Sequence, residues 1–324
     1  MSIGHSDHFT DSWRVGKMAP DHIHHTAYTP RNQVIKAAIL LLHGMQEHSG
    51  RYADLANYLT GQGYAVLTYD HSGHGRTAKN SEQLGFFRRS RPGSLLVEEA
   101  EQLSCHLSEQ FPDVPHILMG HSMGSFIARV LLKHAAHRFN GAILVGTGGP
   151  NPLAALFRPV LYVANLIAPE RRSKWLNTLF RHINNEKFKH ETPNDGTNWL
   201  SKSITNREAF LNDELCGVDF SNNAFYGLIS LNVAATEAGW AASIPRKMPL
   251  LFVSGTDDPI GDFGKGVKKT VKRLRDHGFG HVDLKLYPGM RHEILNEADR
   301  QLVYDDLRDW LAKTIQSPPD RQPG

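Results

Sequence analysis

The chain has 324 residues, of which 40% are hydrophobic and 21% charged, a composition typical of a folded globular protein rather than a disordered one. Lys and Arg together number 36 and Asp and Glu 33, so the formal net charge is +3 and a strongly basic nucleic-acid-binding protein is excluded. The length allows one large domain or two ordinary ones.

The sequence carries neither a targeting signal nor a cysteine framework. Its first 25 residues are polar and lack the apolar core of a signal peptide. The longest apolar run, Ala37–Leu42, has six residues, whereas a membrane-spanning helix needs about 20. The two cysteines, Cys105 and Cys216, are too few for a disulfide scaffold or a cysteine-rich metal site. We therefore expect a soluble, cytoplasmic protein.

Short apolar runs alternate with segments of helical period along most of the chain. Strands are predicted at Val34–Leu42, Tyr64–Tyr69, His116–Met119, Ala142–Thr147, Leu250–Ser254 and Val282–Tyr287. Helices are predicted at Arg51–Thr60, Leu95–Gln110, Met123–His137, Lys265–His277 and Glu293–Lys313. Because the strand runs are apolar at nearly every position, they fit a parallel sheet buried on both faces. The alternation predicts a doubly wound, mostly parallel α/β core over residues 21–150 and 244–316, with residues 1–20 and 317–324 as loose tails.

Residues 151–243 interrupt this alternation, because no clear strand occurs there and apolar residues recur at near-helical spacing. They predict a helical insertion between two strands of the sheet. Ligands of open α/β sheets bind at the carboxyl ends of the strands, and lids at that edge exclude water. We therefore favour a cap over a binding site. The alternative is a second helical layer that serves stability alone.

A candidate nucleophile lies in the segment Gly120-His121-Ser122-Met123-Gly124, which fits the pattern G-x-S-x-G. The pattern is short, but here it follows a predicted strand and opens a predicted helix, as a nucleophile elbow does. A serine hydroxyl is a weak nucleophile, so it must stand exposed on a tight turn where a base can take its proton. The two glycines leave room for such a turn.

The base and the acid of a triad are expected after later strands, at the same edge of the sheet. His292 follows the strand at Val282–Tyr287 and is the candidate base among 19 histidines. A carboxylate that orients it should follow the strand at Leu250–Ser254, where Asp257 and Asp258 stand side by side. The order Ser, Asp, His along the chain is the order that this fold requires. The pattern does not choose between the two aspartates.

An oxyanion hole needs N–H donors aimed at the oxygen that becomes charged. One candidate is the backbone N–H of Met123, the residue after the nucleophile. The other is the backbone N–H of Met45, because Gly44 allows a sharp turn where the strand ending at Leu42 leaves the sheet.

These segments together resemble the α/β-hydrolase fold, specifically the lysophospholipase and monoacylglycerol lipase group, also known as serine aminopeptidase-like hydrolases. The resemblance covers about Ile35 to Leu311. The matching segments are His43–Tyr52, Asp70–Gly75, Gly120–Gly124, Gly255–Pro259 and Arg291–Glu293, with Trp199–Lys202 and Asp213–Gly217 similar to the cap of bacterial members.

The resemblance implies roles for single residues. It places the nucleophile at Ser122, the acid at Asp258, the base at His292, and the oxyanion donors at Met45 and Met123. One departure lies in the loop after Asp70, where the family usually carries Arg and this chain has Ser72. A second lies at Thr77, where Ser is more common.

Other motifs give weaker signals. His22, His24 and His25 are not joined by further ligands at metal-binding spacing, so no metal site is predicted. The segment Gly73–Gly75 lacks the pattern of a phosphate-binding loop. Residues 170–190 carry six Lys or Arg against two Asp or Glu, interleaved with apolar residues. This charge fits either a contact with an anionic membrane surface at its inner face or a solvated helix face, which we favour.

The combined pattern predicts a serine carboxylester hydrolase that acts on a single-acyl lipid, as a lysophospholipase or a monoacylglycerol lipase, through an acyl-enzyme. Its expected partner is a small acyl ester or lipid, with no cofactor and no nucleic acid. One alternative is an esterase, thioesterase or amidase/peptidase of small substrates with the same triad. The other is a ligand-binding module without catalysis, which would have no need of Ser122, Asp258 and His292 together.

Overall fold

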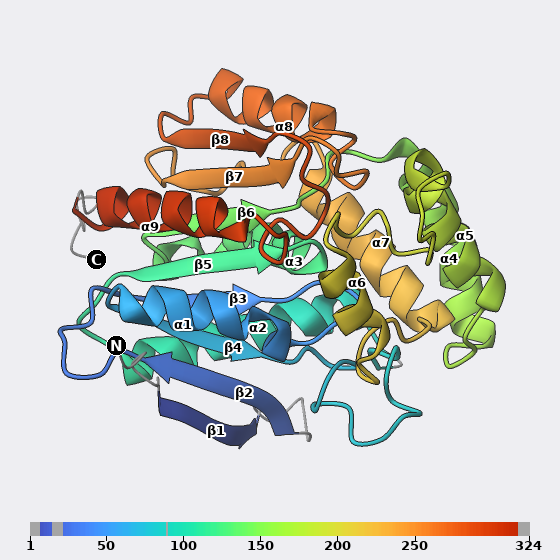
Figure 1. Ribbon diagram of the computed structural model, residues 1–324, viewed down its shortest axis with the longest axis horizontal. Helices are drawn as coiled ribbons and strands as arrows, with labels where there is room; N and C mark the ends of the chain where they lie inside the picture. Colours follow the sequence, from blue (N-terminus) through green and yellow to red (C-terminus); the bar gives the residue numbers. More distant parts are fainter. Residues whose placement is uncertain (1–6, 15–21, 89, 317–324) are drawn as a thin grey trace.

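A mostly parallel sheet lies at the centre of the computed structural model, which describes residues 7–14, 22–88 and 90–316, with side chains from residue 23 onward (Figure 1). The strand order is β1-β2-β4-β3-β5-β6-β7-β8. Pairing of β2 with β1 and β4 is antiparallel, and every other pairing is parallel. The strands are β1 (Asp7–Arg14), β2 (His22–Thr29), β3 (Ala37–Leu42), β4 (Tyr64–Tyr69), β5 (His116–His121), β6 (Gly141–Val145), β7 (Leu250–Gly255) and β8 (Val282–Tyr287).

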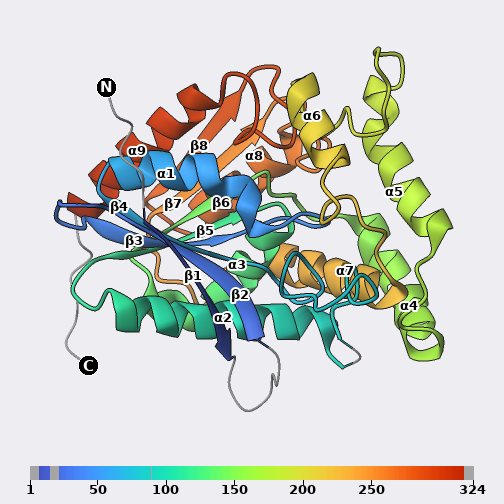
Figure 2. The same ribbon diagram turned by 60° about the horizontal axis from the view of Figure 1, so that its bottom comes forward.

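Helices cover both faces of this sheet (Figure 2). One face carries α1 (Ala53–Gly61) and α9 (Arg300–Gln316). The other carries α2 (Pro92–Gln110), α3 (Met123–Ala135) and α8 (Lys265–Asp276). Side chains alternate along β3, so that Leu40 and Leu42 pack with one set of helices and Ile39 and Leu41 with the other. Burial on both faces explains why the strand is apolar at every position.

The predicted fold class is confirmed, with the six predicted strands present as β3 to β8. The helix predicted to begin at Glu293 begins only at Arg300, which is a correction. The side chain of Glu293 binds Arg51, and that of Glu297 accepts hydrogen bonds from the backbone N–H groups of Arg291 and Lys202. These contacts hold residues 293–299 in turns between β8 and the helix.

Two strands were missed in the sequence. β2 reads His-Ile-His-His-Thr-Ala-Tyr-Thr, and its histidines interrupt the apolar run expected of a strand with two buried faces. Ile23 and Ala27 nevertheless pack into one hydrophobic cluster and Tyr28 into the other. β1 pairs with β2 and falls within the predicted loose tail, which is therefore wrong for residues 7–14. The predictions for three further segments lie outside the described residues. These are the tail residues 1–6, 15–20 and 317–324, and residue 21 at the edge of the core.

Between β6 and β7 the chain forms α4 (Pro152–Ile167), α5 (Lys174–Asn185), α6 (Ile204–Leu211) and α7 (Asn222–Thr236). These helices lie beside the carboxyl ends of the parallel strands, toward which the arrows in Figure 1 point. α7 packs against α2 and α3 and joins the larger hydrophobic cluster, whereas α4 and α5 lie at the outer edge of the molecule. No helix among the described residues has the length and apolar character to cross a membrane.

A buried carboxyl group lies under this edge of the sheet. Glu99 on α2 is 1% exposed and accepts hydrogen bonds from the backbone N–H and the hydroxyl of Ser72. Burial raises the pKa of Glu99 to about 7, although the Ser72 hydrogen bonds and the charge of Arg88 oppose the shift.

The stability of the protein should therefore depend on the charge of Glu99. Its folded pKa lies above its unfolded value, so the unfolded chain loses this proton first and the free energy of unfolding falls as pH rises from about 4.5 to about 7. We expect Glu99→Gln to remove roughly 3 kcal/mol of that fall. Urea unfolding of the wild type and of Glu99→Gln at pH 5 and pH 8 measures this change in the free energy of unfolding. An identical pH dependence in the two proteins would contradict the assignment.

Candidate active site

Ser122 occupies the turn between β5 and α3. Its backbone adopts φ 51° and ψ −118°, a conformation that L residues rarely take and that recurs at functional sites. The turn is held by its own N–H, which donates to the Val145 carbonyl at 3.0 Å. A Cβ on Gly120 would lie 2.4 Å from the Gly124 carbonyl oxygen, and one on Gly124 would lie 2.3 Å from that of Leu42. Glycine is required at both positions because helix and strands approach this closely.

His292 and Asp258 are in direct contact. Nδ1 of His292 lies 3.0 Å from Oδ1 of Asp258, and both side chains are buried. A carboxylate only accepts, so Nδ1 carries the proton and Nε2 is free to act as a base. Asp258 is held in turn by the backbone N–H of Ile260 and the hydroxyl of Ser254.

Asp257, the other candidate acid, does not reach the histidine. Its carboxylate lies 3.4 Å from Nζ of Lys187, at a partly exposed position. The geometry therefore separates the two neighbours that the sequence left equivalent.

The loops of the serine and the histidine touch through His121. Nε2 of His121, the residue before Ser122, lies 3.2 Å from the carbonyl oxygen of His292, and the two rings lie 4.8 Å apart between centroids. Trp199, from the segment between α5 and α6, stacks 5.1 Å from the His292 ring. The base is thus enclosed between the elbow and the segment that follows β6.

The loop after β3 lies against the serine. A Cβ on Gly44 would be only 3.2 Å from Cβ of Ser122, so the backbone of this loop passes beside the hydroxyl. Met45 follows on that loop and is half-buried, and Met123 is the fully buried first residue of α3. The two residues predicted to donate to the oxyanion thus follow the carboxyl ends of β3 and β5.

A buried charge network that the sequence analysis missed connects these loops. Arg51 donates to both carboxylate oxygens of Glu293, at 2.6 and 2.8 Å, and to Glu47 at 2.8 Å. Glu47 also accepts from the backbone N–H of Gly44 at 2.6 Å. Asn206 on α6, in the segment between β6 and β7, donates to Glu293 at 2.7 Å. The only signal in the sequence was that Glu47, Arg51 and Glu293 stand within the segments that resemble a known family.

The network sets the charge of its members. Burial alone would raise the pKa of Glu47, but the hydrogen bond from His121 and the charge of Arg51 hold it well below its usual range. Burial alone would lower the pKa of His121, but the hydrogen bond to Glu47 raises it. Both ring nitrogens of His121 face oxygen acceptors, Glu47 and the His292 carbonyl, which favours the protonated ring. The surroundings of His121, the residue before Ser122, therefore stabilise its protonated form.

Among the described residues, one cluster of three side chains could hold a metal ion, and it lies beside this network. Ligand atoms of His48, Asp213 and Cys216 lie within 4.8 Å of one another. Nδ1 of His48 accepts from the Gly50 N–H, so Nε2 carries the proton that is donated to Asp213 at 2.8 Å. Hydrogen bonding between the loop after β3 and the segment between β6 and β7 accounts for this arrangement.

Comparison with known proteins gives a family and a set of relatives. Residues 33–299 match the family model described as serine aminopeptidase, S33. The chain is 27% identical to a monoacylglycerol lipase of Mycolicibacterium smegmatis, over 86% of this chain and 89% of the relative. It is 34% identical to human monoglyceride lipase, over 86% and 83% of the two chains. A thermostable carboxyl esterase of Bacillus coagulans, solved in complex with glycerol, superposes with a TM-score of 0.83 at 28% identity, over 95% and 98%.

Proposed function

The chain belongs to the serine aminopeptidase S33 family and is a hydrolase of the α/β-hydrolase type, and from that premise we propose that it is a serine carboxylester hydrolase that cleaves single-acyl lipids. The observation that carries the proposal is the Asp258–His292 pair, in contact at 3.0 Å, next to the strained turn of Ser122. A buried carboxylate that fixes the imidazole tautomer is what a general base for a serine needs.

In the proposed mechanism Oγ of Ser122 attacks the acyl carbonyl while Nε2 of His292 takes its proton. The N–H groups of Met45 and Met123 donate to the oxyanion as it forms. The alcohol leaves with the proton from His292, and an acyl-enzyme remains on Ser122. Water, deprotonated by the same imidazole, then releases the fatty acid. Asp258 stays ionised and stabilises the imidazolium in both steps.

A row of aromatic rings supports an acyl chain as the group recognised. The Trp199 ring, stacked on His292, lies 5.9 Å from that of Phe180 on α5, which lies 6.5 Å from that of Phe225 on α7. The rings lead from the base to the helices between β6 and β7. Each CH₂ buried along them would contribute about 0.8 kcal/mol to binding.

Monoacylglycerol is the head group that we favour over a lysophospholipid, because two relatives bear that name. The basic residues that could read a phosphate are partly engaged elsewhere. Arg172 donates to the carbonyls of Ser81 and Leu84, Lys187 pairs with Asp257, and Lys189 with Glu186. A short ester is the second candidate, since the similar Bacillus coagulans structure is a carboxyl esterase.

We also propose that residues 151–243 form a cap and that α4 is its contact with lipid surfaces. α4 exposes apolar side chains at helical spacing, with Leu156 71%, Val160 61% and Ile167 79% exposed. Trp175 on α5 is 65% exposed beside them in sequence. A contiguous apolar helix face of this kind is typical of an interaction surface, and an amphipathic helix at an interface buries such residues among acyl chains.

Fatty-acid release from a monoacylglycerol and from a lysophosphatidylcholine with the same acyl chain tests the function. We expect release from the monoacylglycerol to be at least about tenfold faster, since the proposed site offers no dedicated phosphate ligand. Ser122→Ala should lower it by a factor of about 10⁴ or more, because that variant lacks the nucleophile. Its unfolding midpoint should stay close to wild type. Residual activity of a few per cent in Ser122→Ala would refute Ser122 as the nucleophile. Release from the lysophospholipid alone would refute monoacylglycerol as the preferred substrate.

Vesicle binding tests the lipid contact. The double variant Leu156→Glu, Val160→Glu places two charges on the exposed face of α4 and should abolish co-sedimentation with phosphatidylglycerol vesicles. Hydrolysis of a water-soluble short ester should be unchanged, because these side chains point away from the protein core. Leu302→Glu, at an exposed position of α9, is the matched control. Equal loss of vesicle binding in both proteins would contradict a specific role of α4.

A further inference from the structure

One buried arginine has no carboxylate beside it in the part of the chain that the structure describes. Arg129 on α3 is 1% exposed, and its guanidinium donates to the carbonyl of Gly148 at 2.9 Å and, at 3.4 Å, to the hydroxyl of Thr147. The guanidinium also stacks 4.3 Å from the ring centre of Trp240. Among the described residues, Nε of Arg129 has no hydrogen-bond partner.

Other buried arginines in this protein are neutralised. Arg51 lies between Glu47 and Glu293, Arg207 contacts Asp195 at 2.9 Å, and Arg291 contacts Glu191. Burial of an unpaired cation is strongly unfavourable, whereas a neighbouring anion compensates for the lost hydration. Burial lowers the pKa of Arg129 to about 9, and no neighbouring charge offsets it. The position therefore lacks a counter-charge within the part of the chain that the structure describes.

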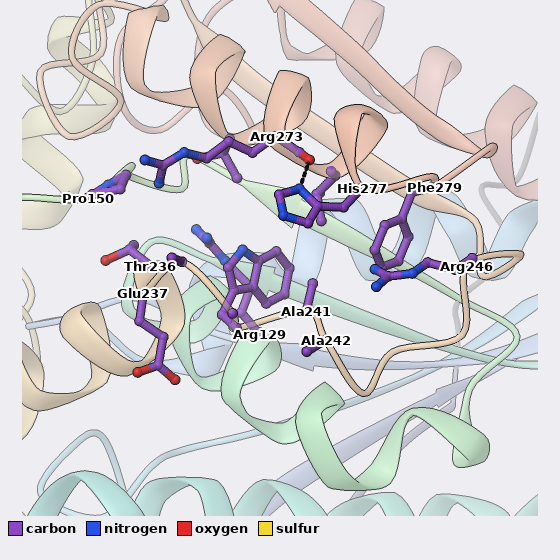
Figure 3. Close-up of a pocket in the computed structure, with 15 residues that line it drawn as sticks. Arg129, Pro150, Thr236, Glu237, Ala241, Ala242, Arg246, Arg273, His277 and Phe279 are labelled. Carbon is purple, nitrogen blue, oxygen red and sulfur yellow. Dashed lines mark hydrogen bonds between the residues drawn. The ribbon is translucent and has the colours of Figure 1, made fainter.

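Arg129 forms part of the wall of a cavity of about 80 Å³ between α3, α8 and the segment that follows α7 (Figure 3). Two more guanidinium groups line it, Arg273 from α8 and Arg246 from the segment before β7. Of the lining residues only Glu237 is acidic, and its carboxylate lies 2.5 Å from Nζ of Lys133. The cavity therefore has a surplus of positive charge.

The space and the donors suit an oxyanion. The cavity exceeds the volume that a single water requires, and it is open to the surface where Arg273 and Arg246 are exposed. Guanidinium groups present planar pairs of N–H donors that match the oxygens of a phosphate, and such charge-assisted bonds are stronger than neutral ones. Neither Arg246 nor Arg273 forms an ion pair within the described residues: Arg246 stacks on the ring of Phe279 at 4.6 Å.

We propose that this cavity is a binding site for a phosphate group, either inorganic phosphate or a small phosphate monoester, with Arg129 as its buried counter-charge and Arg273 and Arg246 as its rim. The site is separate from Ser122 and His292 and does not depend on the proposed hydrolysis. Bound phosphate would place an anion against the guanidinium of Arg129 and so lower the cost of its burial.

Calorimetric titration of the full chain with inorganic phosphate, at constant ionic strength set with sodium chloride, tests the proposal. We expect one phosphate to bind per chain. Arg273→Ala and Arg246→Ala, both at exposed positions, should each weaken binding by about tenfold or more, since each removes a charge-assisted hydrogen bond. Glycerol 2-phosphate in place of phosphate distinguishes the two sources: tighter binding indicates a monoester, weaker binding the free ion.

Lys268→Ala is the matched control, because Lys268 is an exposed cation on the same helix that does not line the cavity. It should leave phosphate affinity within twofold of wild type. Arg129→Met should abolish binding; if it fails to fold, the two rim variants decide alone. No heat of binding above the chloride control, or equal weakening in Lys268→Ala and Arg273→Ala, would overturn the proposal and leave Arg129 as a packing residue.

Discussion

Arg51 lies between two buried carboxylates, and the arrangement of the site depends on this contact. Glu47 belongs to the loop after β3 and Glu293 to the loop after β8, so one guanidinium joins loops from different parts of the sheet. Removal of the cation would leave two unpaired buried charges, which is far more costly than loss of a surface ion pair. The network therefore restricts both loops, and with them Gly44 and His292, to one relative position.

Further hydrogen bonds join Glu47 to the residue before the strained turn, and Glu293 to a helix at the edge of the sheet. Glu47 binds His121, whose ring reaches the carbonyl of His292, so the residues before the serine and at the base are joined directly. Asn206 on α6, within the proposed cap, donates a further hydrogen bond to Glu293. A strained φ at Ser122 persists only where the surroundings over-determine it, and this network together with the close glycine contacts supplies that restraint.

Sequence patterns located the parallel strands and placed the proposed triad in the loops after β5, β7 and β8. They could not choose between Asp257 and Asp258, which differ only in the direction of their side chains, and the contact of Asp258 with His292 favours Asp258 as the proposed acid. The hydrogen-bond network of Arg51 could not be predicted from the sequence, since its partners Glu47 and Glu293 lie 4 and 242 residues away along the chain. β2 was missed because histidines, among them the buried His25, stand where apolar residues were expected.

The claim that Ser122 is the nucleophile is tested most directly by active-site labelling. The protein is treated with a fluorophosphonate, digested, and the modified peptide is identified by mass spectrometry. The account predicts one adduct per chain on Ser122, because His292 takes the proton of that hydroxyl as it attacks the probe. The variant Ser122→Ala should remain unlabelled. An adduct on another residue, or none under conditions in which the folded protein hydrolyses esters, would contradict it.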